Sequence, residues 1–344
     1  MLRLLWFFPL TLFVAATHLI ADGWEAFGKG MEGERLVRAE ASPNWRDGVF
    51  VNGIPLFNPF LDRPERWFDS SEHAVPHEPL AVHTPDPASF ADDPGTRITW
   101  FGHSIVLIET AGVRFLTDPV WAKRVSPYTW IGPERWYEPP VALHDLPPID
   151  AVLISHDHYD HLDMETIKRL KERTGRFIVP LGVGEHLAYW GIPEEKITEL
   201  DWWDEHVVEG VRVVATPARH ASGRMIIDND RTLWMGFAIL GVDHSIYFSG
   251  DTGLFPEMKD IGDQLGPFDV TMIEVGAYGA DWPDWHIGPE QAVLAPRPGI
   301  TVHLDQPEAE ERWWPGVPWQ SAEEAPITAT GEFDRAFRSK ASDD

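Results

Sequence analysis

The segment 156–161 reads His-Asp-His-Tyr-Asp-His and carries the residue types that bind transition metals. It follows the apolar run 151–154, which is typical of a buried strand. In an extended turn after that strand, the first two histidines project to one side, whereas the final Asp-His pair falls at the start of the next helix and faces back. This spacing predicts two neighbouring metal positions. The candidate ligands are His156, His158, Asp160 and His161.

Two later apolar runs also end in residues that bind metals. The run 211–215 leads into His220, and the run 245–249 leads into Asp251 within Gly-Asp-Thr-Gly. A carboxylate has two oxygens and can bridge two cations, whereas an imidazole gives one lone pair to one metal. Taken singly, a histidine after a strand is more often a structural residue, and Gly-Asp-Thr-Gly is also a good turn. Their order behind the histidine segment favours one shared site.

The elements that would position these residues alternate along the chain from residue 97. Short runs rich in β-branched and aromatic residues predict strands at 97–100, 105–108, 113–116, 151–154, 177–179, 211–215, 234–240, 245–248 and 270–273. Helical spacing or a leading proline predicts helices at 164–170, 256–265 and 289–295. Many strands with fewer helices indicate packed sheets covered outside, in one α/β domain of roughly 250 residues.

Composition limits the chemistry further. The 344 residues include no cysteine, which excludes disulfides, Cys-ligated zinc, iron–sulfur clusters and thiol nucleophiles. The 28 Lys and Arg against 55 Asp and Glu give a net charge of −27, which repels phosphate backbones, so no nucleic-acid partner is expected. With 43% apolar residues the chain can bury a large core. Any metal site must use nitrogen and oxygen ligands.

The amino-terminal part differs from the rest. Residues 1–21 form a nearly uncharged apolar run that contains Arg3 and is followed by acidic residues. This predicts a signal peptide or membrane anchor, with a buried core helix as the alternative. The flanking charges predict a membrane-anchored or exported protein at the periplasmic or extracytoplasmic face. Residues 22–96, rich in Pro, Gly, Asn and Asp, are expected to be an extended lead-in packed on a body of residues 97–344.

With these motifs the chain resembles the metallo-β-lactamase-fold hydrolases, and among them the N-acyl-phosphatidylethanolamine phospholipase D-like branch. The resemblance covers about residues 40–295. The His-x-His-x-Asp-His pattern is common to the superfamily, whereas Tyr159, the Trp202-Trp203 pair and Gly-Ala-Tyr at 276–278 are similar to that branch. The resemblance implies an αββα metallo-β-lactamase sandwich as the hydrolase domain over residues 97–344, preceded by the Pro-rich lead-in and the N-terminal hydrophobic segment.

The resemblance also implies a dinuclear zinc site. The implied ligands are His156, His158 and His220 for one Zn²⁺ and Asp160 and His161 for the other, with Asp251 bridging the two. Asp160 would in addition orient the attacking hydroxide, which makes it a candidate catalytic residue. His286, in Trp-His-Ile-Gly-Pro-Glu, would lie beside the substrate phosphate as a second one.

The activity implied is that of a zinc-dependent phosphodiesterase of phospholipase D type, acting on N-acyl-phosphatidylethanolamine-like lipids. Two zinc ions lower the pKa of a shared water toward ~7 and hold a phosphoryl oxygen while the metal-bound hydroxide attacks. The expected partners are a phospholipid or other phosphodiester and a membrane surface, and the sequence does not indicate an oligomeric state. Two alternatives stay open: another metallo-hydrolase, such as a lactonase or cyclic-phosphate esterase, and a catalytically impaired relative that binds a ligand.

One motif of the branch is absent from this sequence. Its members carry His-Trp-Gly-Thr-Phe about twenty residues after the position of His286, and that histidine completes the coordination of the second zinc. This chain instead passes directly to Pro-Arg-Pro-Gly-Ile at 296–300, as if shortened near 293–296. His303 either replaces the lost ligand or is an exposed edge-strand residue. We therefore expect tight metal binding at the first position and weak or no binding at the second.

Some further residues have two interpretations each. His103, in Gly-His-Ser, is expected to be a buried core histidine or a donor near the metals. Asp118, in Thr-Asp-Pro, is expected to support the site or to cap a turn. Four tryptophans either line a lipid entrance or fill the core. They are Trp202, Trp203, Trp282 and Trp285.

Overall fold

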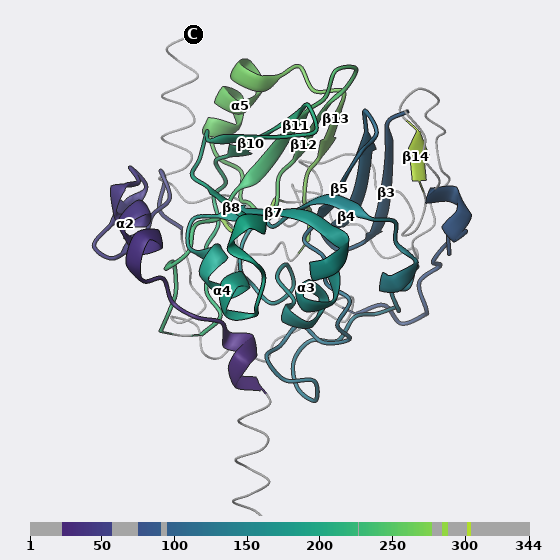
Figure 1. Cartoon of the computed structure of the whole chain (residues 1–344), viewed down its shortest axis with the longest axis horizontal. Helices are drawn as coiled ribbons and strands as arrows, with labels where there is room; N and C mark the ends of the chain where they lie inside the picture. The colour runs from purple at the N-terminus through teal and green to yellow at the C-terminus, as the bar shows by residue number, and fades with distance from the viewer. Residues whose placement is uncertain are drawn as a thin grey trace, which may run out of the picture.

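The computed structural model describes residues 23–56, 75–90, 95–225, 227–276 and 284–287, and the backbone of residues 301–303. Two β-sheets pack against each other, and helices lie on their outer sides (Figure 1). No helix in these ranges is long and apolar enough to span a membrane. The expected hydrophobic segment 1–21, the helix at 289–295 and the shortening near 293–296 lie outside the described residues.

The larger sheet has seven strands within the described ranges, in the order β14-β3-β4-β5-β6-β7-β8. Strands β5 to β8 pair in parallel, whereas β14, β3, β4 and β5 pair antiparallel. Its strands are β3 (Arg97–Gly102), β4 (Ile105–Thr110), β5 (Val113–Thr117), β6 (Ile149–Leu153), β7 (Thr174–Pro180), β8 (Ile197–Leu200) and β14 (Thr301–His303).

The smaller sheet, in the same part of the chain, has the order β13-β12-β11-β10-β9 and is antiparallel except for the β12–β13 pair. Its strands are β9 (Glu205–Val208), β10 (Val211–Thr216), β11 (Gly236–Leu240), β12 (Ser245–Phe248) and β13 (Val270–Met272). A separate hairpin joins β1 (Trp45–Arg46) to β2 (Val49–Phe50). The helices are α2 (Gly33–Ala41), α3 (Met164–Leu170), α4 (Val183–Tyr189) and α5 (Glu257–Leu265), with short 3₁₀ turns η1 (Glu25–Phe27), η3 (Pro87–Phe90), η4 (Leu143–Asp145), η5 (Lys171–Arg173) and η6 (Glu194–Lys196).

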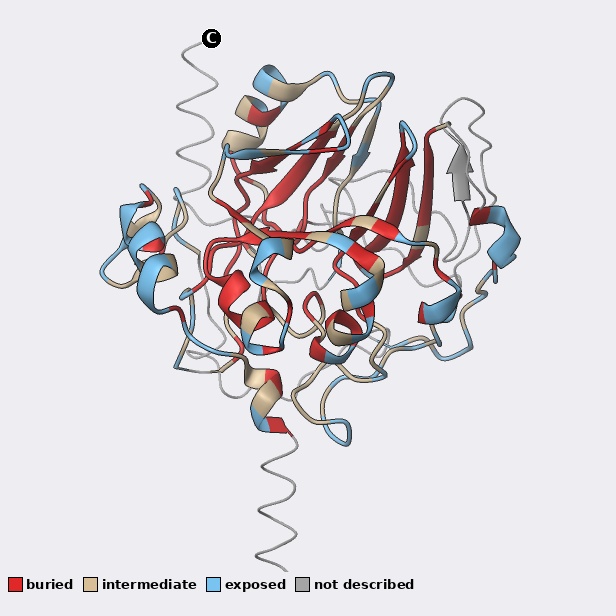
Figure 2. Ribbon diagram, viewed as in Figure 1, coloured by how far each residue is buried: buried red, intermediate tan, exposed pale blue. Residues whose placement is uncertain are grey.

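Three apolar layers hold these elements together. Successive side chains of a strand point to opposite faces, so Ile108 of β4 joins the layer between the sheets while Leu107 joins the layer under α3 and α4. A third layer joins Tyr247 of β12 to Ile261 of α5. The resulting order, helix–sheet–sheet–helix, confirms the predicted αββα sandwich. Figure 2 shows the buried strands between helices that are partly exposed.

The structure adds elements that the sequence reading did not predict. Strands β8 and β9 are short and carry charged residues, and α4 follows Gly182 and itself contains a glycine, so their patterns are weak. Strand β11 begins two residues later than predicted, after Trp234, whose buried indole donates to the Ala218 carbonyl. The remaining predicted strands and the helices at 164–170 and 256–265 are present within a few residues.

The expectation of an extended lead-in is corrected over Gly33–Ala41, which form α2. This segment is rich in Glu, Arg, Leu and Ala, which are strong helix formers. Arg35 of α2 lies 3.2 Å from Glu185 Oε2 and 3.5 Å from Glu199 Oε1, both on the body. The described part of the lead-in is therefore packed on the body, as expected, but its first element is helical.

Candidate metal centre

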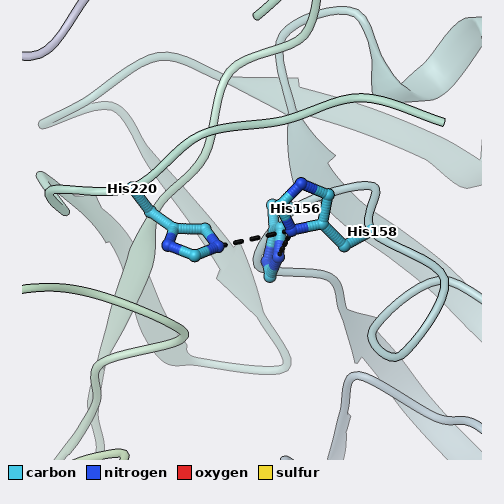
Figure 3. A group of neighbouring side chains, drawn as sticks. All are labelled: His156, His158 and His220. Atoms are coloured by element: carbon cyan, nitrogen blue, oxygen red, sulfur yellow. Dashed lines mark hydrogen bonds between the residues drawn. The ribbon is translucent and has the colours of Figure 1, made fainter. Parts of the chain in front are cut away.

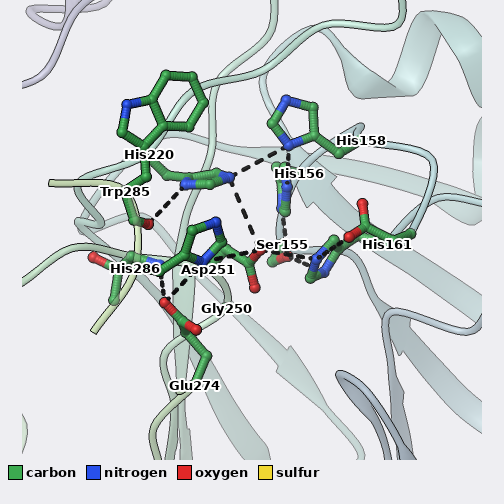
Figure 4. Close-up of polar contacts among 12 residues, drawn as sticks. Ser155, His156, His158, His161, His220, Gly250, Asp251, Glu274, Trp285 and His286 are labelled. Atoms are coloured by element: carbon green, nitrogen blue, oxygen red, sulfur yellow. Dashed lines mark hydrogen bonds and ion pairs between the residues drawn. The ribbon is translucent and has the colours of Figure 1, made fainter. Parts of the chain in front are cut away.

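Loops from both sheets bring polar side chains to one place (Figure 4). In the larger sheet these loops follow β3, β5 and β6, and in the smaller sheet they follow β10, β12 and β13. Asp163 caps the amino end of α3 by accepting a hydrogen bond from the Glu165 amide, which fixes where the loop after β6 ends. The side chains gathered there are His103, Asp118, His156, His158, Asp160, His161, His220, Asp251, Glu274 and His286.

The first group consists of three imidazoles, as predicted. His156 Nε2 lies 2.8 Å from His158 Nδ1, and His220 Nε2 lies 3.3 Å from that same atom (Figure 3). Ligand atoms at tetrahedral angles and about 2.0–2.1 Å from a zinc ion are about 3.4 Å from one another. The three ring nitrogens therefore have the spacing that one cation requires.

Contacts on the opposite sides of the rings set the tautomers of these histidines. His220 Nδ1 donates to the Trp285 carbonyl at 3.2 Å, because a carbonyl can only accept. His156 Nδ1 faces the Ser155 hydroxyl at 2.9 Å. Both contacts leave the Nε2 lone pair directed at the neighbouring imidazoles. Burial, reinforced by nearby histidines, lowers the pKa of His156 and of His220 well below the ordinary value, which favours the neutral form that binds metal.

The second group is built around His161, which is fully buried. Its Nδ1 donates to Asp118 Oδ2 at 2.8 Å, and Asp118 also accepts hydrogen bonds from the amide and hydroxyl of Ser155 at 2.7 and 2.6 Å. The expected supporting role of Asp118 is thus seen: it orients a histidine ring, as carboxylates behind metal ligands do. Among the described residues, His161 Nε2 has no hydrogen-bond partner of normal geometry, and it faces Asp251 Oδ2 at 3.1 Å and Asp160 Oδ2 at 3.8 Å.

The carboxylates around His161 favour the binding of a cation. Burial opposes a charge on this ring, but Asp251, Asp160 and the hydrogen bond to Asp118 together raise the pKa of His161 well above its ordinary value. Burial also opposes a charge on Asp251 and so tends to raise its pKa, yet the nearby His161 lowers that pKa well below the ordinary value. A divalent cation at this position would neutralise the same carboxylates, and the orphaned Nε2 would supply a ligand atom. The residues present therefore fit a metal site.

Asp251 lies between the two groups, as predicted for a bridging ligand. Its Oδ2 is 3.1 Å from His161 Nε2 in the second group and 4.0 Å from His220 Nε2 in the first. The same oxygen is 3.8 Å from His286 Nδ1. All six predicted ligands and the predicted catalytic His286 are therefore brought together.

Glu274 is a site residue that the sequence reading missed. It follows β13, and its Oε1 accepts hydrogen bonds from His286 Nδ1 and from the Ile287 amide, both at 3.1 Å. Burial tends to lower the pKa of His286, but the bond to Glu274 and the charge of Asp251 raise it above the ordinary value. The signal that could have revealed Glu274 is its place directly after a strand, the position that Asp251 also occupies.

Residues far away in the sequence support His220 and His286. Asn52 of the lead-in donates to the His220 carbonyl at 2.7 Å and accepts from the His220 amide at 3.1 Å. Arg219, fully buried, lies 2.9 Å from Asp284 Oδ1, an ion pair that joins the loop of His220 to the segment of His286. No local sequence pattern predicts such contacts.

The segment 156–161 is held in place by further contacts of Asp157 and Arg224. Asp157 accepts from the Gly223 amide at 2.7 Å, and its Oδ2 lies 3.3 Å from His186 Nε2. The buried Arg224 donates to the carbonyls of Asp157 and Leu162 at 2.7 and 2.9 Å. Its guanidinium also stacks 4.1 Å above the Tyr159 ring. The loop conformation that aims the histidines is thus fixed by backbone contacts.

The remaining predicted residues divide into several cases. His103 is not a buried core residue: its side chain is 47% exposed, and its Nε2 lies 3.3 Å from Asp160 Oδ2. Trp202 packs against the layer between the sheets and donates to the Trp234 carbonyl at 2.6 Å, which is a core role. Trp203 is partly exposed. The Trp285 carbonyl holds His220, and Trp282 lies outside the described residues.

Comparison with known proteins decides the family. A family model described as "Beta-lactamase superfamily domain" matches residues 113–297. The chain belongs to this superfamily. Its metallo-β-lactamase fold agrees with the helix–sheet–sheet–helix layers and with the histidine and aspartate ligands described above.

Three relatives indicate which branch of the superfamily the chain resembles. An uncharacterized protein of Mycobacterium tuberculosis is 43% identical over 294 residues, covering 84% of this chain and 77% of the relative. "N-acyl-phosphatidylethanolamine-hydrolyzing phospholipase D 1" of Caenorhabditis elegans is 40% identical, covering 65% and 66%. The mitochondrial N-acyl-phosphatidylethanolamine-hydrolyzing phospholipase D of Saccharomyces cerevisiae is 31% identical, covering 57% and 43%. These matches confirm the resemblance to the N-acyl-phosphatidylethanolamine phospholipase D-like branch.

Proposed function

We propose that the protein is a zinc-dependent phosphodiesterase that hydrolyses N-acyl-phosphatidylethanolamine-like phospholipids, releasing phosphatidic acid and an N-acylethanolamine. The observation that carries the proposal is Asp251, which lies between the three-histidine group and His161 with its carboxylate oxygen facing both. Ligands of imidazole and carboxylate type without any thiolate suit Zn²⁺ among other first-row metals. The choice of substrate is supported by the 40% identity to the nematode phospholipase D.

The chain's own residues divide the work around the substrate. Two bound divalent cations would activate a water and withdraw charge from a phosphoryl oxygen. Asp160, whose side chain is 37% exposed, lies at the open side of the site, where it can accept a proton from the attacking water. His286 is oriented through Nδ1 by Glu274, so its Nε2 is free to donate to a phosphate oxygen. The water adds to phosphorus, the P–O bond to the N-acylethanolamine breaks, and the proton that Asp160 accepted passes to the departing oxygen.

The test uses the full chain, loaded with Zn²⁺, and vesicles that contain a labelled N-acyl-phosphatidylethanolamine. Water labelled with a heavy oxygen isotope should place the label in phosphatidic acid and none in the N-acylethanolamine, because attack occurs at phosphorus. His158→Ala should lower turnover by at least about 100-fold, since it removes a ligand and outer contacts alone cost about 10–100-fold. His144→Ala, which changes an exposed histidine outside the site, is the matched control.

Other outcomes would replace the proposal. Hydrolysis of a lactone or of a cyclic phosphodiester, with no release of phosphatidic acid, would assign a different metallo-hydrolase on the same scaffold. Binding of the phospholipid without any turnover would assign a relative that has kept only the binding function. Either result contradicts the phospholipase activity.

The proposal extends to a membrane-attached, extracytoplasmic location, through residues 1–21. The full chain should sediment with membranes and resist extraction by salt, and a chain that starts at Gly23 should remain in the supernatant. Equal distribution of the two proteins would contradict this part of the proposal and leave the activity untouched.

A further inference from the structure

The second metal position has one protein ligand fewer than the phospholipase D-like branch implies. Asp160 and His161 belong to it alone, Asp251 is shared with the first position, and the His-Trp-Gly-Thr-Phe motif that would supply another histidine is absent from the sequence. These three protein ligands and one water reach the minimum of four that zinc takes in catalytic centres only by sharing Asp251 with the first cation. A further protein ligand near Asp160 would stabilise the second cation.

His303 was the candidate replacement for the missing ligand, but its backbone lies far from the second metal position. Strand β14 pairs antiparallel with β3 so that His303 lies opposite Arg97, the first residue of β3. The metal centre lies beyond Gly102, at the other end of that strand. Five residues of strand span about 16 Å, so His303 begins far from Asp160.

His103 lies where the missing ligand is needed. It occupies the turn between β3 and β4, and its Nε2 is 3.3 Å from Asp160 Oδ2. The His103 and His161 rings meet edge to face, with centroids 4.9 Å apart. One ligand atom from each of His103, Asp160 and His161 lies within 4.8 Å of the other two. These separations resemble those within the three-histidine group, which has the spacing of a metal site.

The turn at His103 fixes where its imidazole lies. Its φ of 50° is left-handed, a region that residues other than glycine enter uncommonly and in which Asn, Asp and His are enriched. The turn is held there by the Trp100 indole, which donates to the His103 carbonyl at 2.6 Å. Histidine is therefore compatible with this turn, and glycine would be as well.

We propose that His103 is a ligand of the second cation, together with Asp160, His161 and the bridging Asp251. The buried Nε2 of His161 faces the same position, 3.8 Å from Asp160 Oδ2 and 3.1 Å from Asp251 Oδ2. This inference rests on the dinuclear site of the proposed function but not on the identity of the substrate. It replaces the expectation of a weak or absent second cation with the expectation of two stable ones.

The experiment counts zinc on the purified full chain after dialysis against a chelating resin. The unaltered protein should retain two equivalents, and His103→Gly should retain one, with the dissociation constant of the second equivalent raised by more than about 10-fold. Glycine is chosen because it accepts a φ of 50° and so keeps the turn. Added imidazole should restore the second equivalent to His103→Gly, because the removed side chain is 47% exposed and leaves an accessible gap.

Two controls separate the possible results. His144→Ala and His303→Ala should each keep both equivalents, and His103→Asn, which also tolerates the turn, should lose the second one. If His103→Gly keeps two equivalents at unchanged affinity, the inference is overturned while the dinuclear site stands. If the unaltered protein holds at most one equivalent, the dinuclear site itself is wrong, and both proposals fail with it.

Discussion

Two histidines at the candidate metal centre are oriented by the atom that the other nitrogen of the ring contacts. His220 is held by a carbonyl and His161 by the carboxylate of Asp118, so both present Nε2 to the site. The sequence predicted six candidate ligands that the structure brings together, because their types and spacing in short loops carry the information. It did not predict the partners behind them, such as Asn52 and Glu274, since those contacts join segments with no shared local pattern.

Asp118 allows a test of this orienting effect. In Asp118→Asn the amide group can face His161 Nδ1, which would move the ring proton to Nε2 and remove the lone pair that binds metal. We expect the second zinc equivalent to bind about 10–100-fold more weakly, with the first unchanged. A titration against a chromophoric chelator measures both constants. Asp145→Asn, at a partly exposed aspartate outside the site, is the control, and equal constants in both variants would contradict the role of Asp118.

Replacing His220 and replacing His303 should remove different amounts of bound zinc. His220 Nε2 is 3.3 Å from His158 Nδ1, whereas the backbone of His303 lies at the far end of β3. His220→Ala is therefore expected to lose more zinc during dialysis than His303→Ala. Elemental analysis measures the zinc that each variant retains. Equal losses would indicate that His303 is also a metal ligand.

Asp230 should make stability depend on pH. Burial raises its pKa to about 6, so between pH ~4 and ~6 the folded state binds a proton that the unfolded state does not, and this group's contribution to stability increases as the pH falls from 7 to 4. Asp230→Asn stays neutral, keeps an acceptor for the Ser222 amide, and suits a φ of 58°. We expect it to raise the free energy of unfolding by about 1–3 kcal/mol at pH 7.5 and by less at pH 5.

Urea unfolding at the two pH values measures this difference. Asp243→Asn, at an exposed loop position, should show no such change between pH 7.5 and 5. A constant gain for Asp230→Asn across both pH values would mean that the carboxyl group of Asp230 is not titrating in this range.

At the scale of elements, short runs of β-branched and aromatic residues predicted most strands, because each strand buries one face between the sheets and the other under helices. The short strands β8 and β9 were not predicted, since they carry charged residues and are stabilised by pairing with distant parts of the chain. The helix α2 was missed although its residues are good helix formers. The segment Asp284–Ile287, which carries His286, is likewise held by distant contacts, among them the buried Arg219–Asp284 ion pair and hydrogen bonds to His220 and Glu274.

Breaking that ion pair should be costly. Asp284→Asn removes the carboxylate that lies 2.9 Å from the buried guanidinium of Arg219, and breaking a buried ion pair typically costs about 3–5 kcal/mol in the free energy of unfolding. The exposed pair Lys259–Asp263 on α5 is the matched control, and Asp263→Asn should cost only about 0.3–0.5 kcal/mol. Chemical denaturation gives both values. Similar losses in the two variants would show that Asp284 contributes no more than a surface charge.

At the scale of the whole molecule, the net charge of −27 opposes approach to an anionic bilayer. Raising the salt concentration from about 10 to about 150 mM shortens the screening length from about 30 to about 8 Å. We therefore expect the apparent KM on vesicles rich in anionic lipid to fall over this range while kcat stays constant. Vesicles of zwitterionic lipid with a small fraction of substrate should show a weaker effect. An unchanged KM on the anionic vesicles would contradict repulsion as the limit on encounter.

The two hydrogen bonds between Asn52 and His220 change what counts as a functional unit. A fragment that begins at residue 97, where the sandwich begins, would retain every candidate ligand yet lose the contacts of Asn52 with His220, and one that begins at residue 113, where the superfamily match begins, would lose His103 as well. Chimeras that exchange the amino-terminal third between relatives would therefore also alter metal binding by the recipient protein. For expression and for recombination alike, the useful boundary lies upstream of β1.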